Sequence, residues 1–177
     1  MLNIILINGS LNKNSKTKQV LQLVEYGLKS KKYSTTLLDI GDLDLPIFNP
    51  NIHNKDLIES IRGKLNEASA FIIGSPEYHS GYSGALKNFI DYLDRDVFQD
   101  KPVALVATSG GMKSGINTLN GLRLVFRSLH ADVIPQQIAV CEKEIIDGKF
   151  NKSCLQSVSQ IIYGVENKVD SEKILKI

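Results

Sequence analysis

The sequence predicts a doubly wound α/β fold, in which helices cover both faces of a parallel five-stranded sheet. Five apolar runs alternate along the chain with five segments in which apolar residues recur at helical spacing. Strict alternation of this kind is typical of a parallel sheet with helices on both faces. The 177 residues and a hydrophobic content of 42% suffice for one domain with a substantial core. We therefore expect a single domain over residues 1–177.

The five predicted strands differ in polarity, and this difference predicts their order. The runs at 2–8, 70–74 and 103–108 are nearly all apolar, as in strands that are covered on both faces. The run at 34–40 is more polar, and the run at 133–140 contains Pro135, which is tolerated best on an edge strand. Placing these two strands outside gives the order 2-1-3-4-5, which is the flavodoxin-like arrangement.

Helical periodicity fills the segments between and after these strands. The apolar positions that define it are Val20, Val24 and Leu28; Leu57, Ile61 and Leu65; Leu86, Phe89, Ile90 and Leu93; Leu119, Leu122, Phe126 and Leu129; and Leu155, Val158, Ile162 and Val165. Each set recurs every three or four residues and so forms one apolar face. The segment at 43–54, with two prolines and several asparagines, is predicted to be a functional loop.

Composition excludes several classes of protein and site. The net charge is +2 and the basic residues are dispersed, which argues against nucleic acid as a partner. Cys141 and Cys154 are too few and too isolated for a disulfide framework, a C-x-x-C motif or a four-cysteine iron–sulfur cluster. The N-terminal apolar run reads as a strand rather than a signal peptide, and no run approaches the roughly 20 residues that span a bilayer. We expect a cytoplasmic protein without a membrane or metal site.

Three loops follow the strands predicted at 2–8, 70–74 and 103–108, and all are rich in small polar residues. In open α/β sheets, ligands bind at the carboxyl ends of the strands. The second loop, at 74–88, is the most informative of the three. It contains no acid cluster, cysteine pair or histidine pair, so its chemistry is expected to reside in a bound cofactor.

The first loop, at 8–17, is suited to a terminal phosphomonoester. Its glycine lets backbone approach a ligand, and the hydroxyls of Ser10, Ser15 and Thr17 can donate to phosphate oxygens. A helix that begins near Ser15 adds free N–H groups and a positive dipole end. Ser15 could equally serve as the helix N-cap, or do both. The loop matches neither G-x-G-x-x-G nor a Walker loop, so Asp39 is not expected to bind a ribose.

The second and third loops are suited to a flat heterocycle. Backbone N–H groups of residues 77–79 could bond its edge, and Pro76 rigidifies the turn. Tyr78 and His79 lack an evident charge partner, so we expect them to shape the site rather than transfer protons. In the third loop, at 108–115, adjacent glycines let backbone approach a ring. In isolation that loop could also be a turn without a ligand.

Together these motifs resemble the NAD(P)H-dependent FMN reductase family, and within it the azobenzene-reductase-like members. The resemblance spans about residues 2–140 in the expected order. It is carried by Asn8-Gly9-Ser10, by Ser75-Pro76-Glu77-Tyr78-His79-Ser80-Gly81 with Gly84-Ala85-Leu86-Lys87-Asn88, and by Gly110-Gly111. The middle block is specific, whereas the other two loops are weak signals alone.

The resemblance implies an FMN cofactor held by the three loops. The residues that would bind it are Ser10, Asn12, Ser15, Lys16 and Thr17 at the phosphate, Pro76, Glu77, Tyr78, His79 and Ser80 along the isoalloxazine, and Ser109, Gly110 and Gly111 at its other edge. Many members have arginine where this chain has Asn12. Lys13 offers only a point charge in place of a planar fork, so weaker phosphate binding is expected.

The resemblance also implies a reaction and an assembly. Hydride would pass from NADPH or NADH to N5 of the bound flavin, and then to a quinone, an azo compound or free flavin, with no catalytic side chain. Family members usually form homodimers or homotetramers. By resemblance alone, residues 45–48 and the helix after Gly84 would form the contacts.

Three other functions remain open. A flavodoxin-type electron carrier would share fold and cofactor without oxidising NAD(P)H directly, but such carriers are usually strongly acidic and this chain is slightly basic. A serine hydrolase on an α/β sheet needs G-x-S-x-G and a late histidine, and the sequence has neither. A nucleotide-binding sensor without enzymatic activity is the third.

Overall fold

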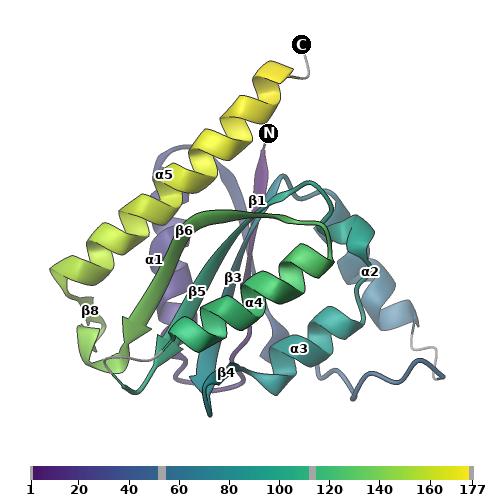
Figure 1. Ribbon diagram of the computed structural model, residues 1–177, viewed down its shortest axis with the longest axis horizontal. Coiled ribbons are helices and arrows are strands. Elements are labelled where there is room, and N and C mark those ends of the chain that lie inside the picture. Colours follow the sequence, from purple (N-terminus) through teal and green to yellow (C-terminus); the bar gives the residue numbers. More distant parts are fainter. Residues whose placement is uncertain (1, 52–54, 112–114, 176–177) are drawn as a thin grey trace.

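A parallel sheet forms the centre of the molecule, and helices cover both of its faces (Figure 1). The computed structural model describes residues 2–51, 55–111 and 115–175, and within them five parallel strands follow the order β2-β1-β3-β5-β6. These strands are β1 (Asn3–Asn8), β2 (Ser34–Asp39), β3 (Ala70–Tyr78), β5 (Pro102–Ser109) and β6 (Asp132–Cys141). This confirms the predicted doubly wound fold and its strand order.

The polarity of each strand matches its place in the sheet. All of β5 is buried, as are all but the first residue of β1 and all but the last two residues of β3. The outer strands β2 and β6 are only partly buried. In β6, the register against β5 shifts between the partners of Val103 and Leu105, where Pro135 lies. Pro135 removes a ladder donor there, as an edge strand tolerates.

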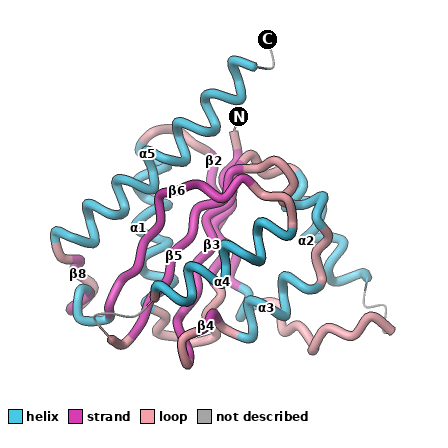
Figure 2. Tube along the Cα trace, viewed as in Figure 1, coloured by secondary structure: helices cyan, strands magenta, loops and turns pink. Residues whose placement is uncertain are grey.

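The helices pack in two layers on opposite faces of the sheet (Figure 2). They are α1 (Lys16–Ser30), α2 (Lys55–Asn66), α3 (Gly84–Asp91), α4 (Ile116–Ser128) and α5 (Lys152–Leu175). Alternate residues of β1 point to opposite faces. Ile4 and Leu6 join the cluster under α1 and α5, whereas Ile5 and Ile7 join the cluster under α2, α3 and α4.

The second predicted loop is in fact a β-hairpin. β3 continues four residues past the expected end at Gly74 and pairs antiparallel with β4 (Gly81–Tyr82). His79 and Ser80 connect them with φ of 51° and 63°. Two central residues with positive φ make a tight hairpin turn, and such turns usually carry Asn-Gly or Asp-Gly. Because His-Ser is not that signal, the sequence did not predict the hairpin.

Smaller elements connect the main ones. Three short 3₁₀ helices occur in the described residues: η1 (Ile40–Asp42), η2 (Arg95–Val97) and η3 (Glu142–Glu144). A second hairpin, β7 (Ile145–Ile146) with β8 (Lys149–Phe150), turns at Asp147-Gly148 and precedes α5. Across residues 2–51, 55–111 and 115–175, no helix is both long and apolar enough to cross a membrane.

Candidate functional site

The three loops after β1, β3 and β5 are joined by hydrogen bonds at the carboxyl edge of the sheet, the lower edge in Figure 1. The Gly9 N–H donates to the Gly74 carbonyl at 2.8 Å, and the Ser83 hydroxyl donates to the Gly9 carbonyl. The Glu77 carboxylate accepts a hydrogen bond from the Gly115 N–H at 2.8 Å. The structure therefore brings the three predicted loops into one cradle.

Glycine is required where the first two loops meet. A Cβ added at Gly9 would lie 2.8 Å from the Gly74 carbonyl oxygen and 2.9 Å from Cβ of Leu86. A Cβ added at Gly74 would lie 2.7 Å from Cγ2 of Thr17. Contacts this short with backbone and Cβ atoms leave no room for a side chain at either position.

Asn8 organises the first loop from within the core. It is fully buried, and its Nδ2 donates to the Ser10 carbonyl and to Asp39 Oδ1, each at 3.1 Å. Its Oδ1 accepts from the Ser10 N–H at 3.3 Å and from the Ser15 hydroxyl at 3.4 Å. Sequence reasoning gave Asn8 no role. The available signal was a polar residue between a buried strand and a glycine.

Ser15 is the N-cap of α1, as one of the two interpretations of the sequence held. Its hydroxyl oxygen accepts from the Lys18 N–H at 3.0 Å. The N–H groups of Lys16 and Thr17, which lie between Ser15 and Lys18, have no acceptor in the part of the chain that the structure describes. Such unpaired N–H groups at a helix start favour an anion.

The remaining polar side chains of the first loop are partly engaged. Ser10 Oγ accepts from the Asn12 N–H at 3.3 Å, and Asn12 Oδ1 accepts from the Asn14 N–H at 2.9 Å. The buried hydroxyls of Thr17 and Thr108 lie 2.6 Å apart. One proton lies between those two oxygens, so the other hydroxyl proton is available to a ligand. Ser10 likewise keeps its proton, because its oxygen is the acceptor.

Asp39 supports the first loop rather than facing a ligand. Its Oδ2 pairs with Lys18 Nζ at 2.8 Å, and its Oδ1 accepts from the Gly41 N–H at 3.1 Å and from Asn8. Burial raises the pKa of Asp39, but the hydrogen bonds from Lys18, Gly41 and Asn8 outweigh it and hold the pKa below 3.8. This is consistent with the expectation that Asp39 does not bind a ribose.

Two serines that sequence reasoning missed fix the start of α3. Ser75 Oγ donates to the Pro76 carbonyl at 2.8 Å and accepts from the Ser83 N–H at 2.9 Å. Ser83 is the N-cap of α3 and accepts from the Leu86 N–H at 3.1 Å. Both serines are buried. Beyond them, Tyr78, His79 and Ser80 lie exposed at the hairpin tip.

The third loop leaves open space above its backbone. A Cβ added at Gly110 would meet no heavy atom of the described residues within 4 Å. Ser109 Oγ donates to the Gly111 carbonyl at 3.0 Å, and Cys141 Sγ lies 3.7 Å from the Gly110 carbonyl oxygen. Residues 112–114, which belong to the same predicted loop, lie outside the described residues.

The cradle fits a phosphorylated flavin. At one end it offers the donors of a phosphate site, namely the Lys16 and Thr17 N–H groups and the Ser10 hydroxyl. At the other end, the open space above Gly110 can admit a flat ring. Among the described residues, no cluster of His, Cys, Asp and Glu could hold a metal ion. The donor set therefore suits an anionic organic cofactor.

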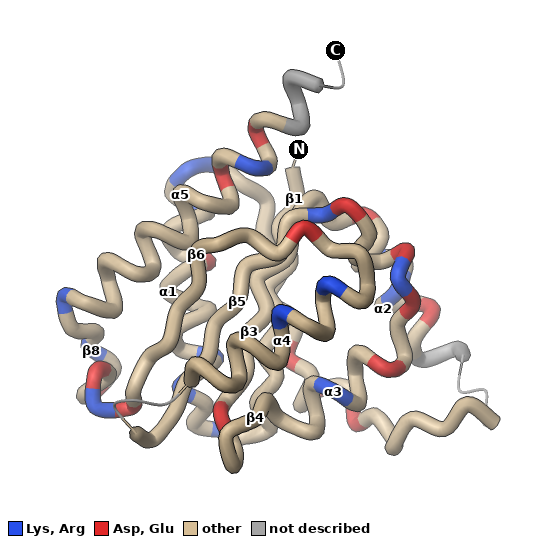
Figure 3. The backbone as a smooth tube through the Cα atoms, in the orientation of Figure 1, with Lys and Arg blue, Asp and Glu red and all other residues tan. Residues whose placement is uncertain are grey.

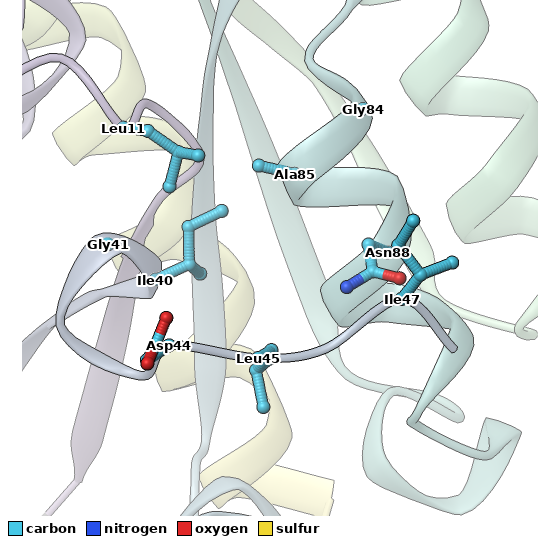
Figure 4. Close-up of a pocket in the computed structure, with 9 residues that line it drawn as sticks. All are labelled: Leu11, Ile40, Gly41, Asp44, Leu45, Ile47, Gly84, Ala85 and Asn88. Carbon is cyan, nitrogen blue, oxygen red and sulfur yellow. The ribbon is translucent and has the colours of Figure 1, made fainter. Parts of the chain in front are cut away.

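A cavity of about 610 Å³ adjoins the cradle between the first loop, residues 40–47 and α3 (Figure 4). Leu11 and Ala85 point into it from opposite sides. Asn88 holds the segment against α3, since its Nδ2 donates to the Pro46 carbonyl at 2.8 Å and its Oδ1 accepts from the Phe48 N–H at 2.7 Å. The residues that line it are Leu11, Ile40, Gly41, Asp44, Leu45, Ile47, Gly84, Ala85 and Asn88.

Comparisons with known proteins agree with this geometry. A family model described as NADPH-dependent FMN reductase matches residues 2–144. The chain is 33% identical over 179 residues to an FMN-dependent NADPH-azoreductase of Staphylococcus saprophyticus, covering 92% of this chain and 95% of that one. It is 29% identical over 163 residues to an NADPH azoreductase of Bacillus sp. (strain OY1-2), covering 91% of this chain and 89% of that one.

Solved structures share the fold. The flavoenzyme FerB, an NAD(P)H:(acceptor) oxidoreductase from Paracoccus denitrificans, superposes with a TM-score of 0.82 at 19% identity, over 97% of this chain and 98% of that one. A flavodoxin from the domain Archaea gives a TM-score of 0.68 at 17% identity, over 96% of this chain and 99% of that one. These likenesses show the fold alone.

Two glycine-to-alanine changes should have opposite effects on stability, because only one of them lies at the contact between the first two loops. Gly9→Ala should lower the free energy of unfolding by about 1–3 kcal/mol, because its Cβ meets backbone at 2.8 Å. Gly63→Ala, on the exposed face of α2 with no described atom within 4 Å of the added Cβ, should raise it by about 0.5–1 kcal/mol. Urea denaturation of both variants checks this. Wild-type stability in Gly9→Ala would show that the loops can separate freely.

The lowered pKa of Asp39 predicts a pH-dependent loss of stability. Its ionised form is favoured in the folded state, so its contribution is present above pH 3.8 and is lost as pH falls through the lowered pKa. Asp39→Asn should therefore cost roughly 1 kcal/mol at pH 7, and the cost should shrink in acid. Denaturation curves from pH 7 to pH 3 measure this difference. Asp42→Asn, on the exposed η1, is the matched control and should have little effect at any pH.

Proposed function

The chain belongs to the NADPH-dependent FMN reductase family, and from that premise we propose that the cradle of three loops is its FMN site. The protein is an FMN-dependent oxidoreductase that uses NAD(P)H. The redox chemistry is that of the flavin, which can take a hydride from NAD(P)H and pass electrons on to an acceptor. The observation that carries the proposal is the hydrogen-bonded junction of the loops, with unpaired donors at one end and open space at the other.

In this proposal the first loop binds the phosphate. The hydroxyls of Ser10 and Thr17 and the N–H groups of Lys16 and Thr17 surround it, with the positive end of α1 behind them. Ser15 contributes as the N-cap that starts the helix there, since its hydroxyl already bonds Asn8 and the Lys18 N–H. Asn12 contributes through its side-chain Nδ2, because its backbone N–H already donates to Ser10 Oγ and its side-chain oxygen accepts from the Asn14 N–H. Neutral donors and a helix dipole therefore supply part of the attraction.

The hairpin and the third loop bind the ring in the same proposal. Pro76, Glu77 and residues 78–80 contribute on one side, and Ser109, Gly110 and Gly111 on the other. Glu77 acts there through its backbone, since its carboxylate is bonded to α4. No protein nucleophile or proton donor is required, and the side chains orient the partners of a hydride transfer.

The acceptors we propose are small oxidants: azo compounds, free flavin and quinones. The curated relatives are azoreductases by name. We place the protein in the cytoplasm, a reducing compartment that suits its free thiols Cys141 and Cys154. Basic and acidic residues are interspersed along the backbone in Figure 3, so we propose no nucleic-acid partner.

An anaerobic absorption spectrum of the FMN-loaded protein tests the function. A yellow sample should bleach on addition of NADPH and recover its colour when an azo dye or a quinone is added. A sample that binds FMN but stays yellow with NADPH would support the electron carrier instead. A colourless protein that binds nucleotide would support the sensor.

Filling the space above Gly110 should weaken FMN binding with little effect on the apoprotein. Gly110→Val places a branched side chain where no heavy atom of the described residues lies within 4 Å of Cβ. We expect the dissociation constant of FMN, measured by flavin fluorescence, to rise at least tenfold while the melting temperature of the apoprotein stays nearly constant. Tyr78→Ala, at the exposed hairpin tip, should change the dissociation constant of FMN only a few-fold. Equal losses in both variants would contradict a ring that lies against the third loop.

We also propose that the protein self-associates as a homodimer or homotetramer through residues 45–48 and α3. Large apolar side chains are exposed on this surface. Ile47 is 88% accessible, and it lies beside Phe48 and lines the cavity. A monomer would leave these side chains in water, and an exposed apolar patch is typical of an interface.

Ile47→Asp should therefore shift the protein towards the monomer. Light scattering after size-exclusion chromatography measures the molar mass. Ile146→Asp is the matched control, since Ile146 is 65% accessible but lies on the β7–β8 hairpin. A monomeric wild type, or an equal shift in both variants, would overturn this assignment of the interface.

A further inference from the structure

Glu77 differs from the residues that follow it in the hairpin, because its side chain is engaged with α4. Its Oε2 accepts from the Gly115 N–H at 2.8 Å, from the Thr118 hydroxyl at 3.0 Å and from the Thr118 N–H at 3.4 Å. Tyr78, His79 and Ser80 are exposed, whereas Glu77 is half-buried and Thr118 fully buried. A single carboxylate oxygen thus receives three donors at the start of one helix.

The N-terminus of α4 needs a cap from elsewhere in the chain. Gly115 occupies the N-cap position with φ of 96° and has no side chain to bond the first helical N–H groups. A side chain there is also obstructed, because an added Cβ would lie 3.2 Å from Cβ of Ala139 and 3.5 Å from Cβ of Ala107. Glu77, 38 residues earlier, supplies the missing acceptor and a negative charge at the positive end of the helix.

A second contact fixes the hairpin along α4. The ring of Tyr82, in β4, packs on Gly121, where an added Cβ would lie 2.9 Å from Cε1 of the ring. Glu77 and Tyr82 are directly paired in the hairpin. The hairpin therefore contacts α4 at its first turn and again further along the helix.

This attachment sets the distance between two walls of the cradle. The hairpin forms one wall, and the turn at Ser109–Gly111, at the end of β5, forms the other. Glu77 fixes Gly115, and an added Cβ at Gly115 would lie 3.5 Å from Cβ of Ala107, so the start of α4 lies against the end of β5 that carries this turn. We infer that Glu77 is a positioning residue for FMN, whose carboxylate caps α4 and so holds the turn at Ser109–Gly111 at a set distance from the hairpin. The inference rests on the proposed function, because FMN is the ligand proposed for that space.

Hydrogen–deuterium exchange of the apoprotein tests the cap directly. In Glu77→Ala, the amides of the first turn of α4 should exchange at least tenfold faster than in wild type, while those of β1 and β3 keep their protection. Glu77→Gln keeps an acceptor oxygen and should restore most of the protection. Glu59→Ala, on exposed α2, is the matched control and should leave α4 unchanged.

FMN titration then tests the positioning role. We expect the dissociation constant to rise about tenfold or more in Glu77→Ala and about threefold or less in Glu77→Gln. The double variant Glu77→Ala/Thr118→Val should bind FMN no more weakly than Glu77→Ala alone, since the two side chains act through one bond. Wild-type affinity in Glu77→Ala would overturn the inference, as would unchanged exchange in α4.

Two further comparisons keep the test decisive. If Glu77→Ala does not fold, Thr118→Val removes the same hydroxyl donor with little change of shape, and Thr118→Ser retains it. Faster α4 exchange and weaker FMN binding in Thr118→Val but not in Thr118→Ser would support the inference, and equal behaviour of the two would overturn it. Failure of the wild type to bind FMN would count against the proposed function, whereas α4 exchange still reports on the cap.

Discussion

The close approach of the first two loops is the constraint on which the rest of the site depends. The bond from the Gly9 N–H to the Gly74 carbonyl, at 2.8 Å, joins the carboxyl ends of β1 and β3 beyond the sheet itself. It forms only because neither residue carries a side chain, since a Cβ on either would meet neighbouring atoms at less than 3 Å. The first turns of α1 and α3 both reach this junction, since Thr17 lies against Gly74 and Leu86 lies against Gly9.

Around that junction, buried polar side chains form hydrogen bonds with the backbone N–H and C=O groups of the loops. Asn8, Ser75 and Ser83 are almost fully buried, and each bonds main-chain groups of a loop that ends or begins near it. A buried loop without such partners would carry unpaired N–H and C=O groups, each costing about 1–3 kcal/mol. These residues shape the cradle, and the donors left over at its surface are those available to a ligand.

The features that the sequence predicted are those that depend on local pattern. Continuous apolar runs identified the central strands, and Pro135 with the polar second strand identified the edges. The position of each loop after a strand located the site. The Glu77–Gly115 bond and the Ser83–Gly9 bond span 38 and 74 residues, so no local pattern indicates them. The Asp147-Gly148 turn did carry a local hairpin signal between Ile146 and Lys149, but it is too short to mark a strand pair by periodicity.

The helix termini at the site determine which end of it can take an anion. The start of α4 already holds the Glu77 carboxylate, which would repel a phosphate. The start of α3 faces an apolar cavity whose lining includes the carboxylate of Asp44.

The start of α1 combines N–H groups that have no acceptor among the described residues with the neighbouring hydroxyls of Ser10 and Thr17, and no acidic residue lies in its first turn. Lys18 does not supply that attraction, because it is paired with Asp39 at 2.8 Å. A phosphate at α1 leaves the ring to extend towards the hairpin and the third loop. The proposed orientation of FMN therefore follows from which helix termini are already neutralised, and it does not require the arginine that Asn12 replaces.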